Sequence, residues 1–374
     1  MRRPGIPSRI LMTADTVGGV WTYAIDLARA LAESGVEIAL ATMGARASED
    51  QRQQAGEIPA LELFESTYRL PWMEQPWADV QLATEWLLEL AARIRPDIVH
   101  LNEPVFGSAP WMVPTLAVAH SCVVSWWQSV WGTAPPEEWS RYQREMSRGL
   151  RAAHRVVAPS RWMLEAVQRN YGVAGGLVIP NGRDAANLYP ESKDPVVFAA
   201  GRLWDQAKNL QVLEQVANRL TWPVHVAGEP CQPGSTRQFA AEHLRLMGQL
   251  SPDAVAASLR RASIYAFPAR YEPFGLSVLE AALAGCALVL GDLPTLRELW
   301  DGAAVFVPPD QPEDLRAALE GLIEDAALRQ ALAMRARRRA LRYTPSRMGH
   351  AYLEVYADLL SPSRTIAEEP ACAS

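Results

Sequence analysis

Residues 183–203 read RDAANLYPESKDPVVFAAGRL, and the change of character within this stretch decides the fold. The segment Arg183–Pro195 is polar, contains two prolines and lacks an apolar period, which is typical of a linker. The apolar run Val196–Leu203 follows at once and predicts a strand buried on both faces of a parallel sheet. We therefore expect one domain on each side of this linker.

Similar short apolar runs recur on both sides of the linker. Before it lie Arg9–Ala14, Val36–Met43, Ile98–Glu103, Thr115–Ser121, Arg155–Ser160 and Leu177–Gly182. After it come Val196–Leu203, Val224–Glu229, Ile264–Ala269, Ala287–Asp292 and Ala303–Pro308. Helical patterns separate many of these runs; one is Trp21–Ser34, which Gly35 ends. This alternation predicts doubly wound α/β units with right-handed crossovers.

The predicted organisation is two Rossmann-like doubly wound domains, at 1–182 and 195–345, joined by a linker at 183–194. A helix follows at 346–361, with an apolar stripe that includes Met348, Tyr352 and Tyr356. Residues 362–374 are rich in Ser, Pro, Ala and Glu, which predicts a disordered tail. Ligands of such sheets bind beyond the carboxyl ends of the strands, so we expect a site in a cleft between the domains.

The bulk properties exclude several classes of protein. A net charge of −6 and a pI of about 5.7 argue against a general attraction to nucleic acid. The four cysteines form no CxxC pair, so a disulfide framework or zinc cluster is disfavoured and a reducing cytoplasm fits best. The start of the chain predicts a first strand and not a signal peptide, and no apolar run predicts a transmembrane helix.

The motif with the most chemistry is Glu272-Pro273-Phe274-Gly275-Leu276-Ser277-Val278-Leu279-Glu280. Glu272 is expected in a loop beyond a strand end, and Glu280 on the second turn of a helix Leu276–Ala284. The amides around Phe274–Leu276 are expected to face a phosphate from that helix N-terminus. Carboxylates that accept from sugar and ribose hydroxyls, beside such amides, suit a sugar nucleotide; a solvated acidic loop is the alternative.

A second motif, Gly201-Arg202-Leu203-Trp204-Asp205-Gln206-Ala207-Lys208-Asn209, directly follows the strand Val196–Ala200. A diphosphate leaving group gains negative charge as a glycosidic bond breaks. Two fixed cations, Arg202 and Lys208, would stabilise that transition state more than the ground state. The alternative is that Arg202 and Lys208 are ordinary surface cations. Their position at the carboxyl end of a strand makes this alternative less favourable.

Two weaker signals lie in the first half of the chain. Gly18 and Gly19 follow the first strand, where glycine lets a ligand approach the backbone closely. A plain strand-to-helix turn is an equal alternative. His120 ends the strand Thr115–Ala119 and could bond a donor sugar, or it could be a histidine satisfied within the protein.

Taken in order, these motifs resemble the GT-B glycosyltransferases of family 4. The matching pieces are Gly18-Gly19-Val20, His120, Asn181-Gly182, Gly201-Arg202-Leu203, Lys208, Glu272 and Glu280. Further matches are Pro96–His100, Ala158–Ser160, Val178–Gly182, Gly248–Leu250 and Leu293–Leu299 with Glu298. The resemblance extends from about Arg9 to Leu360. Each motif alone is modest evidence for the family, but their occurrence in this order is specific to it.

The resemblance implies a role for each matching residue. Arg202 and Lys208 would hold the donor diphosphate, Glu280 the ribose hydroxyls and Glu272 the donor sugar hydroxyls. The remaining assignments are Gly18 and Gly19 near the phosphates or acceptor, His120 at the donor sugar, Leu250 near the base, and Phe274, Gly275 and Leu276 beside the donor.

The resemblance also implies the reaction. It would be a retaining transfer by front-face attack within an ion pair, with no enzymic nucleophile. The donor would be a nucleotide-diphosphate sugar and the acceptor a saccharide or a lipid-linked molecule. The helix near the end of the chain would cross back to the first domain. No Asp-x-Asp motif stands in a strand-end loop, so no metal is expected and protein cations would neutralise the phosphates.

The chain departs from the family pattern at three places. His100-Leu101-Asn102 replaces a frequent His-x-His, Asn209 follows Lys208 where glycine is frequent, and Arg183 replaces an apolar residue after Asn181-Gly182. None removes a donor-binding group, but Asn102 and Arg183 put the acceptor side in doubt.

Two features could touch the acceptor or a membrane. Trp126, Trp127 and Trp131, with Trp139 beyond, could stack on sugars, although core and loop packing is the favoured reading. A stripe of arginines at 3-4-3-4 spacing predicts one basic helix face, which could lean on anionic lipid at the inner face of a membrane. A solvated face is the slightly favoured alternative, because Glu137, Glu138 and Glu145 lie close by. The stripe comprises Arg141, Arg144, Arg148, Arg151 and Arg155.

Two other functions remain open on the sequence alone. One is a sugar-nucleotide isomerase or phosphorylase of the same fold, although a phosphorylase would need a cofactor lysine and a longer chain. The other is a binding protein that keeps the cleft without turnover. The presence of Glu272, Glu280, Arg202 and Lys208 together disfavours it.

Overall fold

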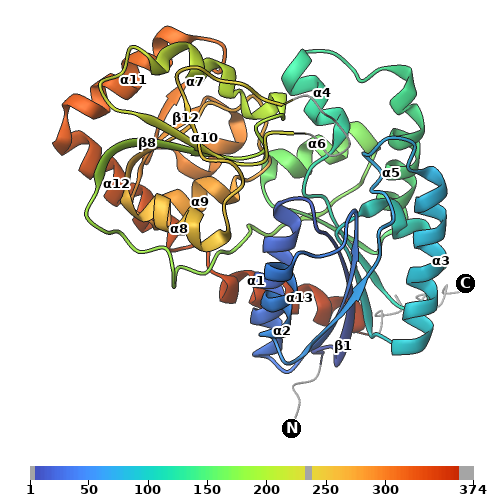
Figure 1. Cartoon of the computed structure of the whole chain (residues 1–374). Helices are drawn as coiled ribbons and strands as arrows, with labels where there is room; N and C mark the ends of the chain where they lie inside the picture. Colours follow the sequence, from blue (N-terminus) through green and yellow to red (C-terminus); the bar gives the residue numbers. More distant parts are fainter. Residues whose placement is uncertain (1–4, 232–237, 362–374) are drawn as a thin grey trace, which may run out of the picture.

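A computed structural model of the chain describes residues 5–231 and 238–361 and shows two α/β domains (Figure 1). Each domain is built on a sheet whose paired strands all run parallel. The sequence prediction of two doubly wound domains is confirmed. The tail predicted for 362–374 lies outside the described residues.

The N-terminal sheet has seven strands in the order β3-β2-β1-β4-β5-β6-β7. They are β1 (Arg9–Asp15), β2 (Glu37–Met43), β3 (Leu61–Glu65), β4 (Ile98–Leu101), β5 (Thr115–Val118), β6 (Arg155–Ala158) and β7 (Leu177–Val178). The helices around it are α1 (Gly19–Ala32), α2 (Glu49–Gly56), α3 (Trp77–Ile94), α4 (Val123–Trp131), α5 (Ser140–Ala152) and α6 (Arg161–Tyr171), with 3-10 turns η1 (Pro104–Ser108) and η2 (Glu137–Trp139).

The C-terminal sheet has six strands in the order β10-β9-β8-β11-β12-β13. They are β8 (Asp194–Ala200), β9 (Val224–Ala227), β10 (Arg245–Leu246), β11 (Ala262–Phe267), β12 (Ala287–Gly291) and β13 (Val305–Val307). Its helices are η3 (Gln206–Lys208), α7 (Leu210–Ala217), α8 (Pro252–Arg261), α9 (Leu276–Leu283), α10 (Pro294–Trp300), α11 (Pro312–Glu324) and α12 (Ala326–Ala340).

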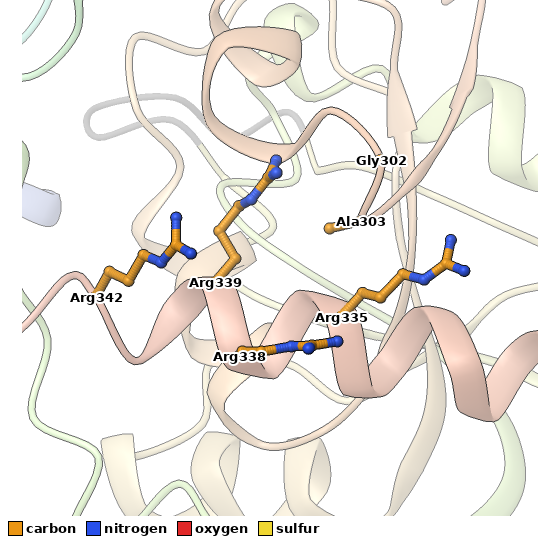
Figure 2. Close-up of a pocket in the computed structure, with 6 residues that line it drawn as sticks. All are labelled: Gly302, Ala303, Arg335, Arg338, Arg339 and Arg342. Carbon is orange, nitrogen blue, oxygen red and sulfur yellow. The ribbon is translucent and has the colours of Figure 1, made fainter.

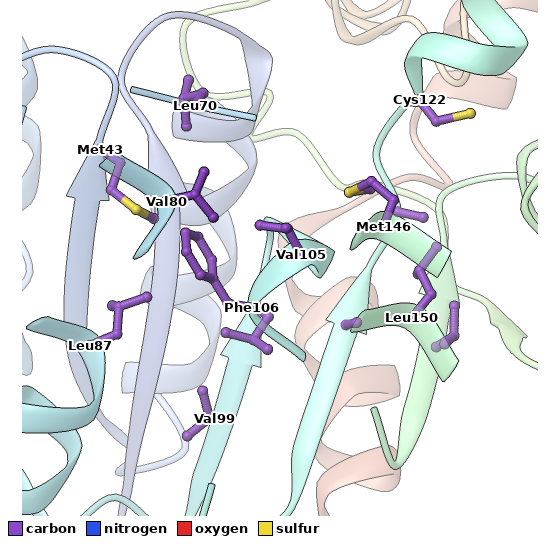
Figure 3. Packing of buried hydrophobic residues seen from close by; sticks show 14 of the residues in the cluster. Met43, Leu70, Val80, Leu87, Val99, Val105, Phe106, Cys122, Met146 and Leu150 are labelled. Atoms are coloured by element: carbon purple, nitrogen blue, oxygen red, sulfur yellow. The ribbon is translucent and has the colours of Figure 1, made fainter. Parts of the chain in front are cut away.

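Alternation along the central strands divides each domain into two cores. In β1, Leu11 packs on one face of the sheet while Ile10 and Met12 pack on the other, because successive side chains of a strand point to opposite faces. Figure 3 shows the first of these cores, where Val99 and Phe106 pack between the sheet and α3. Both faces are covered, which is why the strands appear as continuous apolar runs.

The last helix, α13 (Pro345–Leu360), crosses back to the N-terminal domain and packs against α1, as predicted. Met348, Tyr352 and Tyr356 join the core formed by β1 and α1. The Tyr356 hydroxyl lies 2.6 Å from His100 Nδ1 on β4, which ties the end of the chain to the centre of the first sheet. No helix within 5–231 and 238–361 is both long and apolar enough to span a bilayer.

Two strands were missed by the sequence prediction, and both are at sheet edges. β3 reads LELFE and is half exposed, while β10 has two exposed residues. Edge strands lack the continuous apolar run that marks a central parallel strand, so they gave no signal. The run Ile98–Glu103 was also drawn too long, because β4 ends at Leu101. Asn102 and Glu103 therefore stand beyond the strand end.

Candidate active site

Each sheet has the strand order that creates a topological switch point, between β1 and β4 in one domain and between β8 and β11 in the other. Loops leave such neighbouring strands in opposite directions, which opens a crevice at their carboxyl ends. The predicted residues Arg202 and Lys208 follow β8, and Glu272 follows β11. The fold therefore brings these two distant motifs to one edge of one sheet.

Lys208 and Glu272 form an ion pair at that edge. Lys208 Nζ lies 2.8 Å from Glu272 Oε2, and the two side chains keep 16% and 13% of their surface exposed. Lys208 also stands over the Phe267 ring, 5.2 Å from its centroid. The other oxygen of Glu272 accepts the Phe274 backbone N–H at 3.3 Å. A cation and a carboxylate are thus fixed side by side, but that Phe274 N–H is directed at Glu272, whereas the sequence predicted that it would face a phosphate.

Arg202 is held by Asp205, which the sequence analysis did not single out. Arg202 Nη2 lies 2.8 Å from Asp205 Oδ2, and the guanidinium stands over the Trp204 ring. Burial would raise the pKa of Asp205, but the charges of Arg202 and Lys208, helped by hydrogen bonds, lower that pKa below its ordinary value. Asp205 therefore stays ionised and orients Arg202, whose side chain is 39% exposed toward solvent.

The N-terminal domain approaches this edge from the other side. Trp126 Nε1 on α4 donates to Asp205 Oδ1 at 3.1 Å, so one tryptophan of the predicted cluster binds the donor-side loop. Tyr271, beside Glu272, lies 3.1 Å from the Cys122 backbone nitrogen and 3.0 Å from Ser125 Oγ. The loop that carries Glu272 is therefore anchored to the start of α4 in the other domain.

The glycine turn after β1 faces the same place. A methyl group built on Gly18 would lie 4.0 Å from an Arg202 guanidinium nitrogen, and one on Gly19 would lie 3.4 Å from Leu276. Gly18 N–H donates to Asp15 Oδ1 at 2.9 Å, which fixes the turn. The predicted glycines thus lie across from Arg202 and the start of α9.

Gly275 ends the Glu272 loop in a conformation that favours glycine. Its φ is +88° as the N-cap of α9, where a side chain would be strained. Phe274 before it is buried against Tyr343, and Leu276 after it is half buried. Among the described residues no side chain caps α9, so its first amides keep the unpaired N–H groups that an anion site requires.

Glu280 is engaged in a way the sequence did not predict. Arg183 donates from Nε to Glu280 Oε1 at 2.7 Å and from Nη1 to Asp26 Oδ2 at 3.0 Å. Asp26 lies on α1 with 1% of its side chain exposed, so an ionic triad joins the N-terminal domain, the linker and α9. Arg183 stood out in the sequence only as a departure from the family pattern; Asp26 was not noticed because it lies within an apolar helix face.

The triad has one unsatisfied atom. Asp26 Oδ1 is buried and has no hydrogen-bond partner within the part of the chain that the structure describes. Burial raises the pKa of Asp26 from 3.8 to about 6, against the opposing charge of Arg183. Because this carboxyl binds its proton more tightly when folded, it favours folding at low pH, and the benefit is lost as pH rises through about 6.

The Asp26→Asn variant should lack this loss. Between about pH 4 and about pH 7, the stability of the wild type minus that of the variant is expected to fall by about 3 kcal/mol. Urea unfolding at a series of pH values measures it. Two parallel stability curves would show that Asp26 does not titrate as described.

His120 is part of a buried polar network. Its Nε2 lies 2.8 Å from Asn102 Oδ1, and its ring packs edge-on against Tyr23 at 4.4 Å. Asn102 also donates to the Thr13 carbonyl at 2.7 Å. Burial lowers the pKa of both His120 and His100 to about 3, so both rings are neutral near pH 7. These contacts support the alternative of a histidine satisfied within the protein, although His120 is only half buried.

Glu103 is a buried acid that the sequence analysis missed. It follows β4 and is 9% exposed. Burial, reinforced by the charge of Asp15, raises its pKa well above the ordinary value. The pKa of Asp15 is also raised by burial, against hydrogen bonds from Gly18 and Val17 and the charge of Arg202. The first domain therefore has two acids at its switch point, Asp15 and Glu103. The strongly raised pKa of Glu103 favours its protonated form, which can donate a hydrogen bond.

The remaining predicted residues have more limited roles. Leu250 is half buried against the C-terminal core, beyond the end of β10. The predicted arginine stripe is shorter than expected, because α5 ends at Ala152 and Arg155 begins β6, where it pairs with Asp358. Arg148 pairs with Glu145 at 2.8 Å, so part of the stripe is neutralised.

Within residues 5–231 and 238–361, no three or more His, Cys, Asp or Glu side chains are grouped so that they could hold a metal ion. Cys122, Cys231 and Cys286 are free thiols. The groups that face the crevice from the C-terminal domain are instead the two cations Arg202 and Lys208 and the carboxylate Glu272.

Comparison with known proteins identifies relatives of both halves. The family model described as Glycosyltransferase Family 4 matches residues 17–187, and the one described as Glycosyl transferases group 1 matches residues 194–325. Phosphatidyl-myo-inositol mannosyltransferase of Mycolicibacterium smegmatis is 32% identical over 214 residues, which is 52% of this chain and 54% of that protein. D-inositol 3-phosphate glycosyltransferase of Kineococcus radiotolerans is 26% identical over 91% of this chain and 90% of its own. The chain spans about half the length of the mannosyltransferases it matches.

Solved structures share the fold over nearly the whole chain. Sucrose-phosphate synthase of Thermosynechococcus elongatus matches with a TM-score of 0.79 at 18% identity, over 94% of this chain and 99% of that one. Anabaena Alr3699/HepE, solved in complex with UDP-glucose, matches with a TM-score of 0.74 at 18% identity, over 94% of this chain and 99% of that one. These likenesses establish the two-domain GT-B architecture.

Proposed function

Because the chain belongs to the GT-B glycosyltransferases of family 4, we propose that it moves a sugar from a nucleotide-diphosphate sugar to a saccharide or lipid-linked acceptor, with retention and without a metal. The observation that carries the proposal is the meeting of Arg202, Lys208 and Glu272 at the β8–β11 switch point. Gly18 and Gly19 of the other domain face them.

The donor diphosphate would lie between Arg202, Lys208 and the first amides of α9. As the glycosidic bond breaks, the electron pair goes to the diphosphate oxygen, and the two cations stabilise that growing charge. Glu272 would accept hydrogen bonds from the donor sugar, since its contact with Lys208 holds the carboxylate at this place. Glu280 would accept from the ribose with the oxygen that Arg183 leaves free.

Retention would follow from attack on the face that the diphosphate leaves. The acceptor hydroxyl then adds to the anomeric carbon while its proton passes to the departing diphosphate oxygen. This step needs no enzymic nucleophile, and Glu272 is already committed to Lys208. The support for retention is the family resemblance, and the anomeric configuration of the product, read by NMR, tests it.

The acceptor would enter from the N-terminal domain. Asp15, at the end of β1, and Glu103, just after β4, would bond acceptor hydroxyls at the first switch point. A neutral His120 could accept or donate one such bond. The relatives named for phosphatidyl-myo-inositol favour a lipid-linked acceptor, while relatives named glycogen synthase favour a saccharide. The solved relative in complex with UDP-glucose supports a nucleotide-sugar donor. A cytoplasmic location and a contact of α5 with the membrane stay predictions.

A binding and hydrolysis screen across UDP-, GDP- and ADP-sugars tests the proposal. One donor should bind more tightly than its free nucleotide diphosphate and should be hydrolysed slowly without acceptor. An isomerase of this fold would instead change the sugar without releasing it. If no donor outbinds the free nucleotide, the transferase proposal fails.

Chelation of divalent metals should leave turnover unchanged. Arg202 and Lys208 would supply the positive charge that a metal provides in other transferases. The measurement is the transfer rate with and without EDTA, after dialysis to remove bound metal. Complete loss that Mg²⁺ or Mn²⁺ restores would contradict the proposed mechanism.

A further inference from the structure

A hollow lined by arginines lies outside the cleft, in the C-terminal domain. Its volume is about 220 Å³, and its walls are Gly302, Ala303 and four side chains of and just after α12: Arg335, Arg338, Arg339 and Arg342 (Figure 2). Figure 2 shows Arg335 and Arg339 rising from the helix on either side of Ala303, with Arg342 beyond Arg339. The hollow therefore concentrates positive charge around Gly302 and Ala303, which carry no polar side chain.

The charge of this segment is set by the sequence. Between Ala326 and Leu353 the chain has seven arginines and no aspartate or glutamate. This segment is therefore basic, whereas the whole chain has a net charge of −6. Arginines in the last turn of a helix are favoured by the helix dipole, which accounts for Arg337, Arg338 and Arg339. The dipole does not account for the absence of any acid, because like charges one turn apart repel each other.

No described carboxylate neutralises the hollow by an ion pair. Arg339 donates to the Leu299 carbonyl, at 3.4 Å. The two nearest acids along the chain are engaged elsewhere: Asp301 with Arg297, and Glu298 with the backbone N–H groups that begin α6. Arg335, Arg338 and Arg342 are exposed, so their guanidinium groups are available to a ligand.

The hollow is separate from the donor site. Gly302 and Ala303 stand in the turn between α10 and β13. They precede a strand, so they lie on the side of the sheet where the strands have their amino ends. Arg202, Lys208 and Glu272 lie on the side where the strands have their carboxyl ends. In a parallel sheet these two sides are opposite, so one ligand cannot occupy both places.

We propose that the Arg335–Arg342 hollow is a second binding site, and that it binds a phosphoryl group. Guanidinium groups donate paired hydrogen bonds in a geometry that matches phosphate oxygens, and several together select an anion of more than one charge. A volume of about 220 Å³ accommodates a phosphomonoester or a pyrophosphate. The phosphate belongs either to a free small molecule or to the headgroup of an anionic phospholipid.

The test compares two triple variants of equal charge change. One, the α12 variant, is Arg335→Ala with Arg338→Ala and Arg342→Ala. The other, the control variant, is Arg52→Ala with Arg169→Ala and Arg219→Ala, three exposed arginines that lie apart from one another and outside the α5 stripe. One arm titrates inorganic pyrophosphate by calorimetry. The other measures sedimentation with phosphatidylcholine vesicles that contain or lack phosphatidylglycerol. The donor cleft is intact in both variants, so its own affinity for pyrophosphate cancels.

The α12 variant should bind at least about tenfold more weakly than the control variant in one arm, and that arm identifies the source of the phosphate. All three α12 positions are exposed, so the fold should be kept; the single variant Arg338→Ala should show part of the same loss if the triple variant unfolds. Equal binding by both variants in both arms overturns the proposal. Since no readout uses donor turnover, this result is independent of the proposed function.

Discussion

The Lys208→Ala variant should turn over its donor about 10²- to 10³-fold more slowly than the wild type, while KM changes much less. Lys208 is expected to act mostly where the diphosphate gains charge, so its loss raises the barrier more than it weakens ground-state binding. Steady-state kinetics on the donor found by the screen measures both parameters. An unchanged kcat would remove Lys208 from the mechanism.

The ion pair with Glu272 complicates this variant, because Lys208→Ala also leaves a half-buried carboxylate without its cation. Glu272→Gln keeps the shape and removes the charge, so it shows the cost of losing the pair from the other side. If Lys208 only positioned Glu272, the double variant would be no slower than Glu272→Gln alone. We expect it to be slower, because Arg202 alone would then face the leaving diphosphate. The variant Lys208→Arg keeps the charge and should recover part of the rate.

The donor half of the site could be predicted from the sequence because its parts are local. Arg202 and Glu272 each stand just after a buried apolar run, and the parallel strands of one sheet have their carboxyl ends on the same side. The pattern predicts which residues reach that edge. It does not predict which side chains pair there, so the contacts of Lys208 with Glu272 and of Arg202 with Asp205 became visible only in the structure.

The acceptor half could not be predicted to the same depth, because its groups are single residues separated along the chain. The sequence analysis included Asn102 and Glu103 in a predicted strand, whereas β4 ends at Leu101, just before them. Asp26 is a charged residue in the buried face of α1, and a helical pattern gives no reason to single it out. Only the return of the linker to α1 explains why a carboxylate is tolerated there.

Replacing Arg183 with alanine should lower the free energy of unfolding by about 3 to 5 kcal/mol near pH 7. Asp26 would then be a buried carboxylate with one oxygen already unpaired and the other without its cation. The cost comes from this uncompensated charge and not from the ion pair as such, since a buried pair is often no better than apolar residues of similar size. Urea or thermal unfolding measures the change.

The Arg297→Ala variant is a matched control. Arg297 also bridges two carboxylates, Asp292 and Asp301, but all three groups are at the surface. Solvent screens such a bridge, so its removal should leave the unfolding midpoint within experimental error. A loss as large as that of Arg183→Ala would mean that the deletion of any bridging arginine destabilises the chain, and that burial is not the reason.

A second substitution at Asp26 separates the two possible causes of the Arg183→Ala defect. If the defect is the buried charge, Asp26→Asn in the same chain should restore most of the stability, because the carboxylate is gone although the cavity left by Arg183 remains. If the defect is lost packing between linker and helix, the double variant will be as unstable as the single one. Restoration would also explain how an apolar residue can stand at position 183 in the family pattern, because the buried Asp26 would be tolerated only with Arg183 beside it.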